Sequence, residues 1–285
     1  MDAPTPSLAQ RLGYAADARL LIVNCDDFGS SHAANTAILS ALDQGVATSA
    51  TLMVPCPWAR EAVRMGQGRD IGVHLTLTCE YPGYRWRALT AGKSLHDADG
   101  FMPATIEEVY RRGDPAEAFA ECKAQIEQAV AWGLEPTHLD SHMGTVQIDP
   151  RFFDIYLGLA EEFDLPLRMP GRRQDEQLGF QGRDRATTRG LLYNENFISP
   201  WPRDTREVIE ARIPGLAPGV SEIYAHPVDD GPELRGYDPD HPDIRANDAV
   251  VLSDPAIGAL MDEAGVVRIS WRPLRNLQRA ERTLA

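Results

Sequence analysis

Short apolar runs alternate along this chain with longer segments of helical periodicity. The run at 20–23 is apolar and partly β-branched, as expected of a strand that is buried on both faces. The next segment repeats apolar residues such as Ala34, Ile38 and Ala41 at helical spacing, and Gly45 stands where a helix commonly ends. The same alternation predicts further strands at 48–55, 70–78, 136–142, 165–170, 221–227 and 266–273, and further helices at 58–66, 115–133, 150–164 and 253–265.

Strands that alternate with helices in this way indicate parallel strands joined by crossover helices, an α/β fold. No GxGxxG follows the first strand and no GxxxxGK[ST] is present, so neither a dinucleotide site nor a P-loop is indicated. Six or seven such units suit a barrel, complete or incomplete, better than an open sheet. We expect one barrel domain over 1–285, with a tail and short helix at 1–17 and insertions at about 170–204 and 227–247.

Composition narrows the range of partners. The net charge of −14 argues against nucleic acid and anionic membranes. No apolar run approaches the length of a membrane span or a signal peptide. The four cysteines share no CxxC spacing and are too few for a disulfide scaffold. These features predict a reduced, cytoplasmic protein without a membrane span, and they leave open a neutral or cationic small substrate and a homodimer.

Chemically reactive side chains gather at the ends of the predicted strands. They are Asp26, Asp27, His74, His138, Asp140, His142, Arg168 and His226. Because the carboxyl ends of parallel strands meet at one edge of a sheet or barrel, these side chains are expected to lie together. Imidazoles and carboxylates are common ligands of divalent ions, so the pattern predicts a metal site.

The neighbouring carboxylates Asp26 and Asp27 call for a cation, because like charges repel and burying either is costly. One could ligate a metal while the other takes a proton from metal-activated water. Other interpretations remain: the pair could cap the following helix, His74 could be a hydrogen-bonded core histidine, and 137–142 could form only a turn. The segment 238–243 around His241 is interpreted as a solvated loop.

A combination of motifs resembles one known family. The segments LLIVNCDDFG, GVATSATLMV, IGVHLTLT, PTHLDSH, LPLR and AHP occur in this order. Together they resemble the YdjC/ChbG family of carbohydrate deacetylases, which includes the hopanoid-associated HpnK proteins. The resemblance extends from about Arg19 to about Arg275, which is nearly the whole chain.

The resemblance implies a deformed (β/α) barrel of the glycoside hydrolase/deacetylase type. It also implies metal-dependent hydrolysis of an acetamide on a sugar, so that the partner is a small N-acetylated sugar. Carried over by position, Asp27, His74 and His142 would hold one divalent ion, with zinc and magnesium as the leading candidates. In the family, further histidines commonly follow the PTHLDSH motif. In this chain the less polar stretch MGTV at 143–146 stands there instead.

The resemblance also implies roles for three other residues. Asp26 would be the general base, and His226 would protonate the leaving amine. Arg168 would lie beside the base or the tetrahedral oxyanion and bind substrate. Two alternatives stay open: a metal-dependent hydrolase of another amide or of a glycosidic bond, and a non-catalytic sugar-binding barrel.

Overall fold

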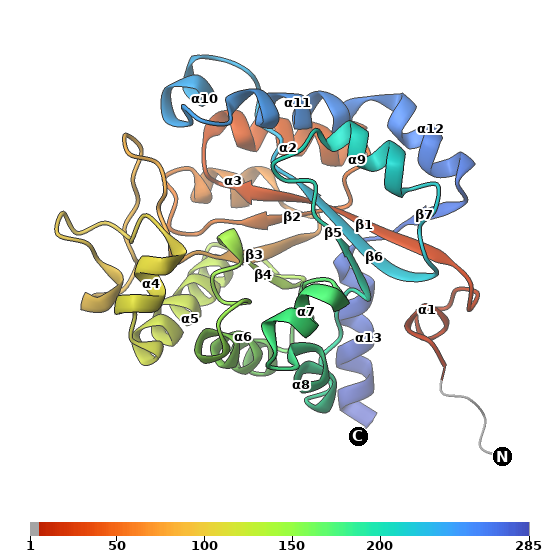
Figure 1. Ribbon diagram of the computed structural model, residues 1–285, viewed down its shortest axis with the longest axis horizontal. Helices are drawn as coiled ribbons and strands as arrows, with labels where there is room; N and C mark the ends of the chain where they lie inside the picture. The colour runs from red at the N-terminus through yellow and green to blue at the C-terminus, as the bar shows by residue number, and fades with distance from the viewer. Residues whose placement is uncertain (1–5, 285) are drawn as a thin grey trace.

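A curled sheet of seven parallel strands forms the centre of the computed structural model, which describes residues 6–284 (Figure 1). The strand order is β4-β3-β2-β1-β6-β5, and β7 pairs with the first residues of β1. Every pairing is parallel, as the alternation of strands and helices predicts. The strands are β1 (Arg19–Phe28), β2 (Ser49–Leu52), β3 (Ile71–Leu75), β4 (Leu139–Ser141), β5 (Asn196–Ile198), β6 (Gly219–Ala225) and β7 (Val266–Arg268).

Helices wrap the outside of the sheet. In Figure 1, α2, α9, α11 and α12 lie on one side of the strands, and α5, α6, α8 and α13 lie on the other. The helices are α1 (Leu8–Arg11), α2 (His32–Gln44), α3 (Ala59–Met65), α4 (Ile106–Arg112), α5 (Pro115–Ala131), α6 (Pro150–Phe163), α7 (Arg172–Leu178), α8 (Gly182–Thr188), α9 (Thr205–Arg212), α10 (Pro232–Tyr237), α11 (Pro242–Ser253), α12 (Pro255–Glu263) and α13 (Trp271–Leu284). Two 3₁₀ turns lie at Lys93–Leu95 and, directly after β4, at His142–Gly144.

Isolated parallel bridges connect β4 with the segment that precedes β5. Leu167 bridges Leu139 of β4 on one side and Tyr193, just before β5, on the other. The ring of parallel segments is therefore continued by isolated contacts where a regular barrel would have full strands. This confirms the expected fold class, a deformed barrel in an α/β protein.

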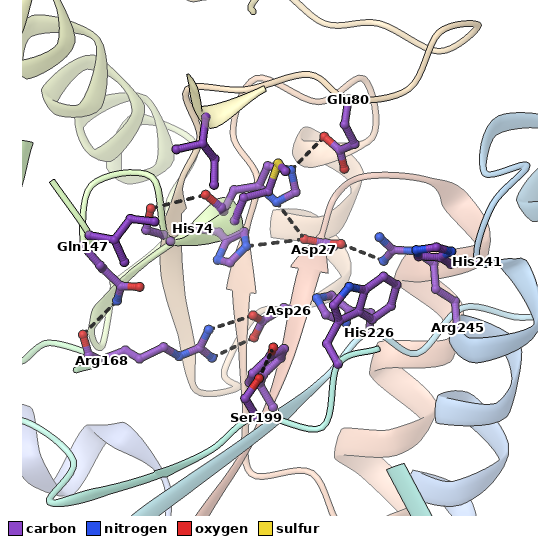
Figure 2. Close-up of a pocket in the computed structure, with 18 of the residues that line it drawn as sticks. Asp26, Asp27, His74, Glu80, Gln147, Arg168, Ser199, His226, His241 and Arg245 are labelled. Carbon is purple, nitrogen blue, oxygen red and sulfur yellow. Dashed lines mark hydrogen bonds and ion pairs between the residues drawn. The ribbon is translucent and has the colours of Figure 1, made fainter. Parts of the chain in front are cut away.

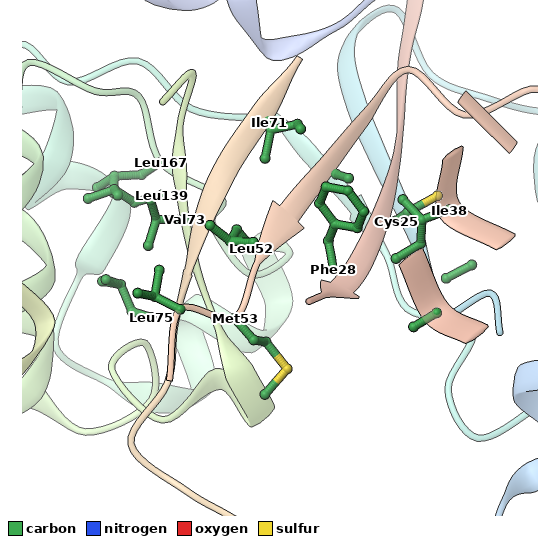
Figure 3. Packing of buried hydrophobic residues seen from close by; sticks show 14 of the residues in the cluster. Cys25, Phe28, Ile38, Leu52, Met53, Ile71, Val73, Leu75, Leu139 and Leu167 are labelled. Atoms are coloured by element: carbon green, nitrogen blue, oxygen red, sulfur yellow. The ribbon is translucent and has the colours of Figure 1, made fainter. Parts of the chain in front are cut away.

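Alternate residues of β1 face two different cores. Leu21, Val23 and Cys25 pack in the main cluster, which runs under the surrounding helices (Figure 3). Leu20 and Ile22 belong to a second cluster that includes Trp271 and Leu274 of α13 and fills one end of the curled sheet. Because side chains alternate with a period of two, Asn24 and Asp26 continue the face of Leu20 and Ile22 and point into the other end of the barrel. On this face, the first half of β1 therefore packs in the second apolar cluster, and its last residues belong to a polar site.

Several predicted elements differ from those observed. The strand expected at 165–170 is only the bridge at Leu167, and that at 266–273 stops at Arg268 because α13 begins at Trp271. The expected insertions are structured: 170–204 contains α7, α8 and β5, and 227–247 contains α10 and the start of α11. Within the tail expected at 1–17, α1 is present, and residues 1–5 lie outside the described part.

Gly72 allows β3 to approach β4 closely and so helps to place His74. A Cβ atom at Gly72 would lie 2.6 Å from two ring atoms of His138 and 2.7 Å from its carbonyl oxygen. We expect Gly72→Ala to lower the free energy of unfolding by about 1–3 kcal/mol, the usual cost of overpacking. Thermal denaturation checks this, with Gly83→Ala as the control, since no atom lies within 4 Å of a Cβ there. Equal melting temperatures for the two variants would contradict it.

Candidate metal centre and pocket

A pocket of about 530 Å³ opens at the carboxyl ends of the strands (Figure 2). It is lined by the six residues to which the family resemblance assigns roles, which are Asp26, Asp27, His74, His142, Arg168 and His226. They come from β1, β3, the turn after β4, the segment around Leu167, and the end of β6. The expectation that strand-end residues converge is therefore confirmed for these six, while their individual roles are a separate matter.

The two adjacent aspartates reach the same pocket because β1 turns at its end. Asp27 has a φ of 65°, in the left-handed region, and the pairing of β1 with β2 is irregular between Cys25 and Phe28. Neither aspartate caps α2: the capping side chain is that of Ser31, which accepts a hydrogen bond from the backbone N–H of Ala34. The interpretation of the pair as a simple helix cap is therefore wrong.

Asp27 Oδ1 is a buried carboxylate oxygen without a hydrogen-bond partner among residues 6–284. Both His74 Nε2 and His142 Nδ1 lie 3.4 Å from it, which is long for a hydrogen bond. Two donor atoms about 2.1 Å from one tetrahedral ion lie about 3.4 Å apart, so the spacing suits a shared cation. The three side chains form a group that could hold a metal ion.

The other nitrogen of each imidazole contacts a carboxylate. His74 Nδ1 lies 2.6 Å from Asp140 Oδ1, and His142 Nε2 lies 2.9 Å from Glu80 Oε2. Such outer carboxylates orient ligand imidazoles and increase their basicity. Burial disfavours the charged rings, but the carboxylates outweigh it and raise the pKa of His74 to about 10 and of His142 to about 9. The local field therefore favours a cation between these groups.

A second arrangement of possible ligands, Asp26 with His74 and Asp140, is less suitable. The guanidinium of Arg168 lies 2.7 Å from Asp26 Oδ2 and 2.9 Å from Asp140 Oδ2. A cationic group thus already lies between these two carboxylates. The trio of Asp27, His74 and His142 is the better candidate for a metal centre.

Arg168 contacts three carboxylates and is almost fully buried. Its Nη1 and Nη2 each donate to one oxygen of Asp26 at 2.7 Å, and its Nε donates to Glu222 at 3.0 Å. Asn24 Nδ2 adds a third hydrogen bond to Asp26, at 2.8 Å. Burial raises the pKa of Asp26, but Arg168 outweighs it and lowers the value to about 2. Arg168 therefore keeps Asp26 ionised and fixed in orientation.

His226 follows the end of β6 and contacts aromatic rings. Its ring centroid lies 4.9 Å from that of Trp201 and 5.3 Å from that of Tyr224, both edge-on. Its backbone N–H donates to Asp248 at 2.8 Å. Burial lowers the pKa of His226 to about 4, despite the opposing influence of Asp27. The ring is therefore neutral near pH 7.

Sequence reasoning missed several residues of the site. Glu80 lies in a turn-rich segment without a motif, and Glu222 lies in the middle of a buried strand. Nothing in the local sequence around either glutamate indicates that it belongs to the site. Asp140 was a strand-end candidate without a role. Arg245 lies in the expected insertion, yet it lines the pocket and donates to Asp27 Oδ2 at 2.7 Å. His241, expected in a solvated loop, also lines the pocket.

His138 is the strand-end residue that the structure removes from the candidate set. Its ring stacks on Trp271 with centroids 4.7 Å apart, and it does not line the pocket. Burial holds its pKa well below the usual value. The structural role of a core histidine, which the sequence left open for His74, fits His138 instead, whereas His74 lies at the site.

Fold and site together define an α/β protein with a deformed barrel and a candidate Asp–His–His metal centre. A family model described as YdjC-like protein matches residues 20–263, and the chain belongs to this family. None of the helices in residues 6–284 combines the length and the apolar character that a bilayer crossing requires.

Two curated relatives cover nearly the whole chain. A carbohydrate deacetylase of Thermus thermophilus is 35% identical over 275 residues, 94% of this chain and 98% of the relative. A carbohydrate deacetylase of Geobacillus stearothermophilus is 34% identical over 268 residues, 91% of this chain and 99% of the relative. Among solved structures, a putative cellobiose-phosphate cleavage protein from Enterococcus faecalis superimposes with a TM-score of 0.79 at 22% identity, over 90% of this chain and 99% of the other. That likeness supports the fold.

Proposed function

We propose that this protein is a metal-dependent carbohydrate deacetylase that removes an N-acetyl group from an amino sugar or a related N-acetylated glycoside. The observation that carries the proposal is Asp27 Oδ1, which has no hydrogen-bond partner within residues 6–284 and lies 3.4 Å from an imidazole nitrogen on each of two sides. The names of the two relatives supply the reaction class. In the proposal, Asp27, His74 and His142 hold one divalent ion, zinc or magnesium.

When bound, such an ion would lower the pKa of water and polarise the acetyl carbonyl. In the proposed reaction, water adds its oxygen to the acetyl carbon, the C–N bond breaks, and acetate and an amine leave. Asp26 takes a proton from the attacking water. Arg168 acts on Asp26, because the bidentate contact keeps the carboxylate ionised and aimed into the pocket.

His226 is proposed to deliver a proton to the departing nitrogen. Because its pKa is about 4, the ring does not carry this proton at rest near pH 7. In the proposal, His226 receives the proton that Asp26 took from water, once Asp26 gives it up, and passes it to the departing nitrogen, which leaves Asp26 ionised again. This differs from the simplest form of the expectation, in which a protonated His226 waits for substrate.

The direct test measures acetate release from N-acetylated sugars before and after chelation. We expect a chelator to abolish acetate release and added zinc or magnesium to restore it, because the three ligands act through the ion. Reducing ends are measured in the same samples. Reducing ends without acetate would indicate a glycosidic bond as the target, and sugar binding without either product would indicate a non-catalytic barrel.

A further inference from the structure

We propose that Arg245 is a positioning residue that fixes Asp27 as a one-oxygen metal ligand and connects it to the opposite wall of the pocket. The inference rests on the proposed metal centre and names a further residue of the same site. Arg245 belongs to α11, within the segment 227–247.

The two oxygens of Asp27 face different groups. Oδ2 accepts a hydrogen bond from Arg245 Nη1 at 2.7 Å, whereas Oδ1 faces His74 and His142. The contact with Arg245 prevents the carboxylate from rotating to offer both oxygens. Hydrogen bonds of this kind to ligating carboxylates tune metal affinity.

Arg245 itself is buried and anchored. Its side chain is only 7% exposed, and its backbone carbonyl accepts the N–H of Val228 at 3.2 Å. Val228 is two residues after His226, so this bond ties α11 to the segment that leaves β6. A buried, anchored guanidinium orients a partner better than an exposed one, whose ion pairs are weak.

Arg245 also contacts one wall of the pocket. Arg245 Nε donates to Asp238 Oδ2 at 2.8 Å. Asp238 Oδ1 in turn accepts the backbone N–H groups of Asp240 at 3.2 Å and His241 at 2.9 Å. The guanidinium also lies over the ring of Trp201, 5.3 Å from its centroid, at cation–π distance. Asp238, Asp240, His241 and Trp201 all line the pocket, so one side chain supports this wall and the metal ligand together.

Figure 2 shows this arrangement, with Asp27 between the imidazole side of the pocket and Arg245. Arg168 contacts Asp26 on the other side, but it donates to both oxygens of that carboxylate. Each of the two adjacent aspartates thus has its own buried arginine.

The test compares four variants with the parent protein by titrating the metal-free proteins with zinc in the absence of sugar. We expect Arg245→Met to weaken zinc binding about 10–100-fold, the usual effect of losing an outer-shell partner. Arg245→Lys keeps the positive charge but offers a single amine in place of the guanidinium. We expect its zinc affinity to lie between that of Arg245→Met and that of the parent. Arg235→Met is the control, since Arg235 also contacts two carboxylates, Asp230 and Asp243, but is exposed and outside the pocket.

Asp238→Asn separates the two parts of the proposal. It removes a charge from the wall without touching Asp27, so we expect it to raise KM for an N-acetylated sugar by more than it lowers kcat, with zinc affinity close to that of the parent. Near-UV circular dichroism establishes that each variant is folded. If Arg245→Met is not folded, the comparison is made with Arg245→Lys.

Two results would overturn the inference: zinc affinity in folded Arg245→Met or Arg245→Lys equal to that of Arg235→Met, or an equal loss of zinc affinity in Asp238→Asn. Failure of the proposed function looks different. In that case the parent protein itself binds no divalent ion or releases no acetate, whatever residue stands at position 245.

Discussion

Replacing Asp26 by asparagine is expected to lower kcat for acetate release by about 10²–10⁴-fold, the usual contribution of a general base. The amide keeps the shape of the side chain and one acceptor oxygen, but it cannot take a proton from water. Asp26 is not in the favoured metal-ligand group, so bound metal should remain. Steady-state kinetics together with elemental analysis of the purified variant provide the measurement.

Folding has to be checked in this variant, because the carboxylate accepts two hydrogen bonds from buried Arg168. Removing one partner of a buried ion pair costs about 3–5 kcal/mol. Assays therefore belong well below the melting temperature of the variant. Asp230→Asn is the matched control, since Asp230 is exposed and pairs with exposed Arg235. Turnover at the parent rate by folded Asp26→Asn would remove Asp26 from the role of base.

Replacing His74 by alanine is expected to reduce metal occupancy to background and acetate release with it. The change removes one of the three ligands and leaves Asp140 Oδ1 without the imidazole that it contacts at 2.6 Å. A site with two remaining ligands binds a divalent ion far more weakly, because each ligand lost is replaced by water. Metal content measured after dialysis against metal-free buffer provides the test.

His32→Ala is the control for this experiment. His32 is exposed and contacts Glu61 at 2.9 Å, outside the pocket. Unchanged metal content in His74→Ala would exclude His74 from the ligand set. It would also move attention to other groups around Asp27, since the metal would then be held without the imidazole from β3.

The sequence predicted those residues of the candidate site that lie at the ends of strands. Asp26, Asp27 and His74 lie on strands whose apolar pattern is clear, and parallel strands place their carboxyl ends at one edge. The same reasoning also selected His138, which the structure places against Trp271. Periodicity locates a strand, but at single-residue resolution it does not tell which histidine of β4 and its flanks faces the pocket.

Residues far from the predicted strand ends were not predictable in this way. Glu80 and Arg245 reach the site from a turn-rich segment and from α11, and they lie 165 positions apart in the chain. Their roles depend on distances of 2.9 Å and 2.7 Å to His142 and Asp27, which no local pattern encodes. Short strands caused the other errors, since β5 and β7 have three residues each, too few for a period to be recognised.

The sequence by itself determined the parallel α/β architecture and the presence of carboxylates and imidazoles at strand ends, because apolar periodicity and chain order are local properties. Only the tertiary structure decided how two adjacent aspartates tolerate each other. Asp26 and Asp27 are each paired with a different buried arginine, and in the described part of the chain no group donates a hydrogen bond to Asp27 Oδ1, which leaves this oxygen for a cation. The physical reason is that Coulomb interactions depend on distance in space, and folding brings Arg168 and Arg245 next to residues that lie 142 and 218 positions away.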